Sequence, residues 1–408
     1  MTAQLLVCNT PILIFLFFLS LVDRNYSLPS TLRLLPLSKY PNGRCLDGSP
    51  GGYYFSKSPT NSTSLYIHHQ GGGWCQLGDE TWPNDRCIDR ANTSLGSTLN
   101  ASATFDWGVP PNEVGCAGCS DDPAVNPLMH DWNKVYVLYC DGTTYASSNE
   151  EPFDGLFFNG KDILEGIADE LVNGDFAMGG GAREEVAFEE VVVGGSSAGG
   201  LAVYLHLDWW AAQFSPSTLV VGLPDGGFFR DFPFNNTADT SYDTDLRTVF
   251  DSRNLASGVN EKCVEGRVSE GARPSDCYFA NASLPFIETP IFVVQTVYDS
   301  WQLQWENGMS KPVDYPDLNE YGSGLESDMI EAINSNRNNV VAGFIDRCYH
   351  HCTTDDLWAK TPTILGKTAN IAFSEFFHDI NKTVVYWQAD YTLPLGDEAG
   401  CPVGMNGP

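Results

Sequence analysis

The sequence predicts an α/β fold in which helices cover both faces of a mostly parallel central sheet. Short apolar runs rich in Val, Ile, Phe and Tyr recur along the chain, and segments with helical periodicity separate them. Strands of a parallel sheet are buried on both faces and therefore read as nearly continuous apolar runs. Their alternation with helical segments favours βαβ connections.

The expected elements leave two long irregular regions between them. Apolar residues recur at helical spacing over 163–171, and another helix begins near Glu326. Residues 78–131 and 233–285 show few regular periods, as functional or disulfide-held insertions do. In chain order, the expected strands are 52–55, 64–69, 134–139, 190–193, 218–221, 290–297 and, as the last strand, 339–345.

The first residues predict a secreted protein. Residues 12–22 form an apolar core that is short for a membrane span, and polar residues 23–25 end it. We therefore expect residues 1–25 to be a signal peptide and residues 26–408 to form a single domain, because no repeat or low-complexity linker divides them. A retained membrane anchor is the alternative interpretation.

Cysteine usage agrees with an oxidising compartment. Twelve cysteines are present, and removal of Cys8 with the signal peptide leaves an odd number, so at least one thiol should be free. Cys140, at the end of an apolar run, is a candidate for a buried free thiol. A zinc site at the Cys-x-x-Cys of 116–119 is disfavoured, because no second well-spaced pair accompanies it. Local spacing suggests the pairs Cys75 with Cys87, Cys116 with Cys119, and Cys263 with Cys277.

The acidic net charge limits the range of possible binding partners. The formal net charge of −30 argues against nucleic acids and anionic membrane surfaces, and it opposes the long-range approach of a polyanion. Seven N-x-S/T sequons are typical of a glycoprotein. They lie at Asn25, Asn61, Asn92, Asn100, Asn235, Asn281 and Asn381.

The stretch from residue 190 to 207 carries the clearest chemical signal. A β-branched apolar run precedes Gly195-x-Ser197-x-Gly199, and an apolar segment of helical length follows it. This strand–turn–helix pattern is that of a nucleophile elbow, in which the serine occupies a sharp turn whose neighbours must lack side chains. Ser196 fits less well, because Ala198 stands two places ahead of it. The sequence therefore predicts Ser197 as a nucleophile in an α/β-hydrolase-like fold.

A serine nucleophile needs a base and an acid that orients the base. In α/β-hydrolases these follow in the order Ser, Asp or Glu, His, at the ends of later strands. Asp299 follows the expected strand 290–297, and His350 and His351 follow the strand 339–345. Spacing alone does not choose between the two histidines. Asp225 or Asp141 could replace Asp299, although Asp225, with two glycines after it, reads as a turn.

The reaction also requires donors for the developing oxyanion. One is the backbone N–H of Ala198, the residue after the proposed nucleophile. Gly71-Gly72-Gly73-Trp74 follows an early strand, as the glycine-rich oxyanion loop of esterases and lipases does.

Six ordered blocks together resemble the pectin acetylesterase/Notum family of secreted α/β-hydrolase-like carboxylesterases, and the plant branch more than the animal branch. The plant branch usually has Cys where this chain has Ser196. The blocks are HQGGGWC at 69–75, YCDGTTY at 139–145, GSSAGGLA at 195–202, DGGFF at 225–229, VYDSWQ at 297–302 and CYHHC at 348–352.

The resemblance implies a catalytic triad of Ser197, Asp299 and His351, with His351 chosen because the family's histidine directly precedes the second cysteine of its block. It implies backbone oxyanion donors at Gly73, Trp74 and Ala198, and no cofactor or metal. The expected activity is hydrolysis of acyl esters, above all acetyl esters, on an extracellular or cell-wall polysaccharide such as pectin, by a monomer. The alternatives are a deacylase for a longer acyl chain on protein or lipid, and a non-catalytic glycan-binding protein.

Overall fold

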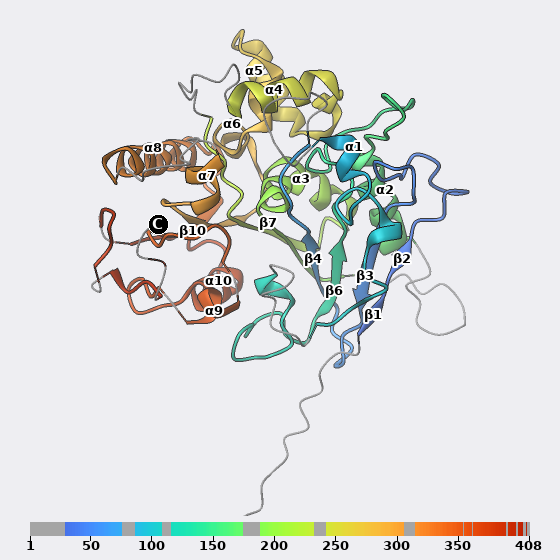
Figure 1. Ribbon diagram of the computed structural model, residues 1–408. Helices are drawn as coiled ribbons and strands as arrows, with labels where there is room; N and C mark the ends of the chain where they lie inside the picture. Colours follow the sequence, from blue (N-terminus) through green and yellow to red (C-terminus); the bar gives the residue numbers. More distant parts are fainter. Residues whose placement is uncertain are drawn as a thin grey trace, which may run out of the picture.

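A large, mostly parallel sheet forms the centre of the molecule in the computed structural model (Figure 1). Its strand order is β11-β10-β9-β8-β7-β4-β6-β3-β2. The pairs from β11 to β6 are parallel, whereas β3 pairs antiparallel with β6 and β2 antiparallel with β3. The structure describes residues 29–75, 86–107, 116–173, 188–231, 242–305, 315–353, 355–360, 362–388, 391–396, 399–402 and 405.

The strands confirm the expected sheet, with two additions, β2 and β11. β11 extends the sheet beyond β10, so the strand expected at 339–345 is not the last strand. The strands of this sheet are β2 (Arg33–Leu34), β3 (Gly52–Ser56), β4 (Ser64–His69), β6 (Asn133–Val137), β7 (Glu190–Ser196), β8 (Leu219–Asp225), β9 (Ile291–Thr296), β10 (Val341–Asp346) and β11 (Val385–Trp387). A separate antiparallel pair joins β1 (Ser30–Thr31) to β5 (Thr104–Phe105).

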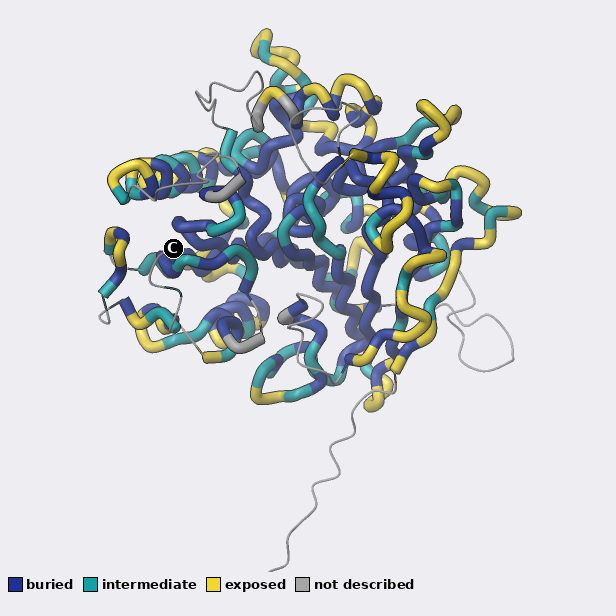
Figure 2. The backbone as a smooth tube through the Cα atoms, in the orientation of Figure 1, coloured by how far each residue is buried: buried dark blue, intermediate teal, exposed yellow. Residues whose placement is uncertain are grey.

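Two apolar cores lie on opposite faces of the sheet. Side chains alternate along each strand, so Leu65 and Ile67 of β4 belong to one core while Tyr66 belongs to the other. The first core is covered by α2 (Gly160–Val172), α3 (Ala198–Gln213) and α8 (Tyr315–Asn334). The second is covered by α9 (Asp355–Ala359) and α10 (Ala369–His378). Figure 2 shows the central strands buried along their length.

The prediction that residues 233–285 are irregular is wrong for most of the residues that the structure describes there. Here α4 (Tyr242–Ser252), α5 (Glu261–Ser269) and α6 (Ala280–Ser283) group together at one end of the molecule (Figure 1). Leu246, Val249 and Phe250 of α4 are buried at helical spacing, so the sequence does contain a signal for this helix, whereas α5 buries only Cys263 and α6 has four residues. Helix α8 likewise begins at Tyr315, ahead of the expected Glu326. Short helices α1 (Cys87–Arg90) and α7 (Ser300–Trp305) complete the described α-helices.

Five disulfides join cysteines of the described residues. All three pairs suggested by local spacing are present, and Cys348–Cys401 adds a fourth link. Cys140 is not a free thiol, because it pairs with Cys45, which lies 95 residues away and gives no local signal. Within the described residues the free cysteine is Cys352. No helix in the described ranges combines the length and apolar character needed to cross a bilayer.

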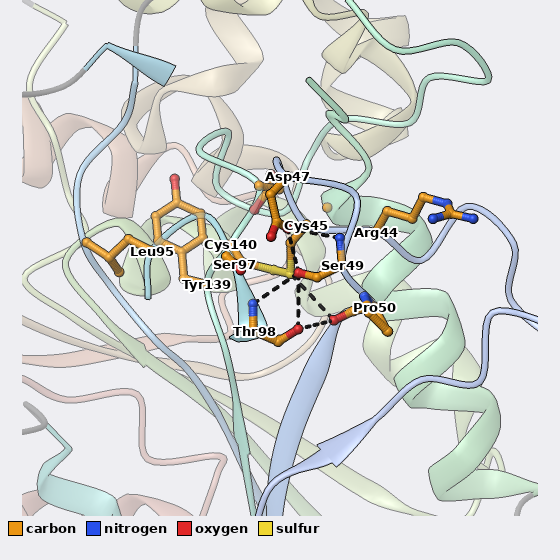
Figure 3. The surroundings of a disulfide bond; sticks show 12 residues. Arg44, Cys45, Asp47, Ser49, Pro50, Leu95, Ser97, Thr98, Tyr139 and Cys140 are labelled. Carbon is orange, nitrogen blue, oxygen red and sulfur yellow. Dashed lines mark hydrogen bonds between the residues drawn. A yellow bond between two sulfur atoms is a disulfide. The ribbon is translucent and has the colours of Figure 1, made fainter. Parts of the chain in front are cut away.

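The Cys45–Cys140 disulfide links a turn to the segment that follows β6 (Figure 3). The amide of Leu46 donates to the Cys140 carbonyl over 2.9 Å. Around it, Thr98 donates through its backbone amide to the Ser49 hydroxyl and through its own hydroxyl to the Pro50 carbonyl. The linkage fixes the start of the 141–145 turn.

Removing this disulfide should cost more stability than removing a short-range one. Replacing Cys45 and Cys140 with Ala is expected to lower the free energy of unfolding by about 4.7 kcal/mol, because the bond closes a long loop of the unfolded chain. The matched control replaces Cys263 and Cys277, which are equally buried but only 14 residues apart. Its expected cost is about 3 kcal/mol. Urea unfolding of both variants measures the difference, and equal costs would contradict the loop-length explanation.

Candidate active site

Ser197 lies on a strained turn between β7 and α3. Its φ of 59° and ψ of −126° place a non-glycine residue in a region that L-amino acids rarely adopt. A Cβ on Gly195 would lie 2.2 Å from the Gly199 carbonyl oxygen, and one on Gly199 would lie 2.1 Å from the His69 carbonyl oxygen. The chain therefore needs glycine on both sides of the serine, as the sequence pattern predicts.

Parallel strands bring three of the sequence-predicted residues together. Ser197 follows β7, Asp299 follows β9 and His351 follows β10, all at the carboxyl ends of strands in one sheet. The Oγ of Ser197 lies 2.8 Å from Nε2 of His351. Nδ1 of the same imidazole lies 2.8 and 2.9 Å from the two carboxylate oxygens of Asp299. A continuous hydrogen-bonded series thus joins the three side chains.

The carboxylate of Asp299 is held from several sides. It is fully buried and caps α7, accepting the backbone amides of Trp301 and Gln302 at 3.0 Å each. The side-chain amide of Gln295 donates to its second oxygen over 3.2 Å. A helix-cap role and contact with the imidazole are therefore combined in one residue.

The imidazole of His351 is half-buried, with its side chain 20% exposed. Burial lowers its pKa, but interactions with the Asp299 carboxylate and with Cys352 together raise the pKa well above its ordinary value. A proton on Nδ1 directed at Asp299 leaves Nε2 free to accept the Ser197 hydroxyl proton. The pair can therefore take up a proton from the serine.

The other candidates for base and acid have different hydrogen-bond partners. His350 contacts Asp346, with Nε2 3.0 Å from Oδ1. Asp141 is fully buried, and its carboxylate accepts hydrogen bonds from the amide and hydroxyl of Thr143. Asp225 is the last residue of β8 and not part of the turn that its sequence suggests.

The glycine-rich segment after β4 packs against the elbow, since β4 and β7 are neighbours. A Cβ on Gly71 would lie 2.9 Å from the Cβ of Ser197. Gly73 has a φ of +65°, and nothing lies within 4 Å of the position of a Cβ, so the space beside it is open. The Tyr139 hydroxyl donates to the Gly73 carbonyl over 2.7 Å, and the Trp74 indole N–H donates to the Tyr278 hydroxyl over 3.0 Å.

An aromatic wall beside the imidazole was not anticipated. The ring of Trp301 stacks on His351 with centroids 5.8 Å apart, and Phe229 lies 6.1 Å from the same imidazole. Trp74 contacts both rings, at 4.8 Å from Phe229 and 5.8 Å from Trp301. The signal available in the sequence is that all three aromatic residues occur just after strands.

The Cys-x-x-Cys of 116–119 is a disulfide in the structure. His68 lies beside it, so one imidazole and two sulfurs come within 4.8 Å of one another. Because the two sulfurs are bonded to each other, they are not thiolates that could hold zinc. Nδ1 of His68 is hydrogen-bonded to the Tyr66 hydroxyl at 2.8 Å.

The loop of residues 347–353, which carries His351 and is called the His351 loop below, is anchored to the C-terminal region. Cys348 is bonded to Cys401, and the amide of Tyr349 donates to the Met405 carbonyl over 2.8 Å. The loop is therefore fixed at two consecutive residues before the imidazole.

The parallel sheet and the strand–turn–helix at Ser197 define an α/β-hydrolase-like protein. A family model described as Pectinacetylesterase matches residues 25–398. The chain belongs to this pectin acetylesterase family and is a carboxylic ester hydrolase.

Two plant relatives and one solved structure are consistent with this family assignment. Pectin acetylesterase 5 of Arabidopsis thaliana is 34% identical over 82% of this chain and 77% of its own length. Pectin acetylesterase 4 of the same plant is 31% identical over 88% of this chain and 87% of its own length. The structure of the Wnt deacylase Notum from Drosophila has the same fold, with a TM-score of 0.70 and 22% identity over 90% of this chain and all of that chain.

Proposed function

We propose that this protein is a secreted serine carboxylesterase that removes acetyl groups from an extracellular or cell-wall polysaccharide such as pectin. The observation that carries the proposal is the hydrogen-bonded series of Ser197, His351 and Asp299. Ser197 is the nucleophile, His351 the general base and Asp299 the residue that orients the base.

The geometry supports a two-step reaction. Ser197 Oγ attacks the ester carbonyl carbon while His351 takes its proton, and the amides of Gly73, Trp74 and Ala198 stabilise the oxyanion. Ala198 is the first residue of α3, so its N–H has no partner within the helix. His351 then donates the proton to the departing sugar oxygen as its bond to the acyl carbon breaks, which gives a free sugar hydroxyl. Water, activated by the same imidazole, releases acetate from the acyl-enzyme.

Acetyl and polysaccharide are favoured by the names of the plant relatives. The net charge of −30 acts in the opposite direction for a polyanion, since it weakens approach at low ionic strength. Salt should therefore increase the rate on pectin more than the rate on a neutral acetylated polymer.

The test is acetate release by the purified protein. Acetylated pectin, an acetylated neutral polysaccharide and nitrophenyl esters from acetyl to palmitoyl are compared at low and moderate salt. We expect the fastest turnover on acetyl esters and measurable release from at least one polymer. Activity that peaks on long acyl chains would instead favour the deacylase alternative. An absence of turnover on every ester, with no labelling of Ser197 by a fluorophosphonate, would favour a glycan-binding protein.

The pH dependence should report the raised pKa of His351. Below that pKa the imidazole carries a proton and cannot accept one from Ser197, so kcat/KM falls as the pH drops through it. Because Asp299 raises the pKa, the midpoint of the acid limb should lie above the ordinary histidine value of about 6.5. Rates on nitrophenyl acetate between about pH 5 and 10 give the midpoint. A midpoint at or below the ordinary value would contradict the assignment.

Secretion and glycosylation are part of the same proposal. The disulfides are of a kind that persists in oxidising compartments. The signal peptide expected at residues 1–25, with the sequon at Asn25, lies outside the described residues, as does the sequon at Asn235. Asn281 is partly buried and lines a pocket. Four sequon asparagines are exposed and open to glycan addition, namely Asn61, Asn92, Asn100 and Asn381.

A further inference from the structure

A second set of buried titratable side chains lies directly behind Ser197 and His351. Asp225, His350 and Asp346 are 8%, 7% and 2% exposed. None of them has a part in the proton transfers of the proposed reaction. Buried charged groups are costly unless they are paired, so their presence at this point calls for a physical reason.

Asp225 contacts both the elbow and the His351 loop. Its carbonyl oxygen accepts the backbone amide of Ser197 over 2.9 Å. Its carboxylate Oδ1 accepts the backbone amide of Thr353 over 2.9 Å. Thr353 is two residues beyond His351, so a single residue holds the main chain on either side of the Ser197–His351 hydrogen bond.

His350 is paired with Asp346 and interacts electrostatically with the Asp225 carboxylate. Nε2 of His350 lies 3.0 and 3.2 Å from the oxygens of Asp346. In the described part of the chain, neither Nδ1 of His350 nor Oδ2 of Asp225 has a hydrogen-bond partner. Burial lowers the pKa of His350, but the charges of Asp346 and then Asp225 raise it overall. An imidazolium at this position is therefore stabilised by both carboxylates.

The carboxyl group of Asp225 needs a nearby positive charge to stay deprotonated. Burial raises its pKa to about 7, and the Thr353 amide and the charges of His350 and His351 oppose this increase. Tyr204 and Cys352 also interact electrostatically with Asp225. Removing the His350 charge would therefore favour the protonated, uncharged carboxyl.

We propose that Asp225 is a positioning residue that sets the separation of Ser197 and His351, and that the His350–Asp346 pair stabilises its carboxylate. This inference rests on the proposed function, because it assigns no role to Asp225 apart from the Ser197–His351 pair. Misplacing a reacting group by about 1 Å can cost about 100-fold in rate. The loss should fall on kcat, since Asp225 is buried behind the residues that meet the substrate.

Two substitutions of Asp225 distinguish the hydrogen bond to Thr353 from the negative charge of the carboxylate. Asp225→Ala removes the acceptor for Thr353, and we expect kcat on nitrophenyl acetate to fall about 100-fold with KM changed less than about twofold. Asp225→Asn keeps an oxygen for the Thr353 amide and should restore kcat to within about tenfold of the wild type. The rate of Ser197 labelling by a fluorophosphonate should fall in parallel with kcat.

A double-mutant cycle tests the His350 pair. His350→Asn should lower kcat in the wild-type background and have little further effect when Asp225 is already Asn, because the charge it stabilises is then gone. The matched control is Asp208→Asn. Asp208 accepts the amides of Glu288 and Thr289 at the other end of α3, so its loss should leave kcat unchanged.

The outcomes are distinguishable from failure of the proposed function. If Asp225→Ala and Asp225→Asn keep wild-type kcat while Ser197→Ala is inactive, the positioning role is wrong and the esterase assignment stands. If Ser197→Ala keeps wild-type kcat, the proposed function itself is wrong. Should Asp225→Ala fail to fold, the test is the double-mutant cycle of Asp225→Asn with His350→Asn. Additive effects of these two substitutions on kcat would overturn the inference.

Discussion

Replacing Ser197 with Ala is expected to lower kcat on nitrophenyl acetate by about 10⁴-fold or more. The hydroxyl is the group that would form the acyl-enzyme, and its Oγ lies 2.8 Å from Nε2 of His351. The fold should remain intact, because alanine and serine both carry a Cβ and are strained alike at a φ of 59°. Circular dichroism and the thermal midpoint check the fold, and steady-state kinetics give the loss.

The adjacent serine provides the control. Ser196 ends β7 and pairs in register with Asp225, so its side chain is buried in the sheet. Ser196→Ala should keep kcat within about tenfold of the wild type, in the range of ordinary buried-polar substitutions. If Ser196→Ala were inactive and Ser197→Ala active, the nucleophile would have been assigned to the wrong residue.

Asp299→Asn is expected to lower kcat by about 10⁴-fold with little change in shape. An asparagine can still cap α7, but its amide nitrogen can donate to Nδ1 of His351, which favours a proton on Nε2, where the base must accept one. The variant also removes the charge that raises the pKa of His351, so the acid limb of the residual activity should move to lower pH. Kinetics across the pH range measure both effects.

Asp208→Asn again serves as the control, because it removes a hydrogen-bonded carboxylate about 16 Å along α3 from the elbow. Its rate and pH profile should match the wild type. An Asp299→Asn variant that behaved like this control would assign the acid to another residue.

Local sequence patterns were sufficient for seven strands of the sheet and for the elbow, but not for β2 and β11. The run of β-branched residues in 191–193 and the glycines at 195 and 199 have one physical reading, since they need a buried strand and a turn without side chains. Asp299 and His351 could be placed near Ser197 because the carboxyl ends of parallel strands meet at one edge. Choosing His351 over His350 needed the family resemblance.

Other features depend on contacts that no local pattern contains. The Cys45–Cys140 pair spans 95 residues, so spacing could not predict it. Asp225 reads as a turn residue because two glycines follow it, whereas pairing with β7 and β9 extends β8 to include it. Helix α5 buries only Cys263 and α6 has four residues, so neither leaves a clear helical period in the sequence.

The disulfide between Cys348 and Cys401 makes the position of the His351 loop depend on whether these two cysteines have been oxidised. A polypeptide that has built its sheet and elbow but has not yet been oxidised would carry the imidazole on a segment without its covalent anchor. Without that anchor we expect the imidazole to lie less often at hydrogen-bond distance from Ser197. Ester hydrolysis should therefore increase as this disulfide forms, and its rate would report the oxidation of the chain.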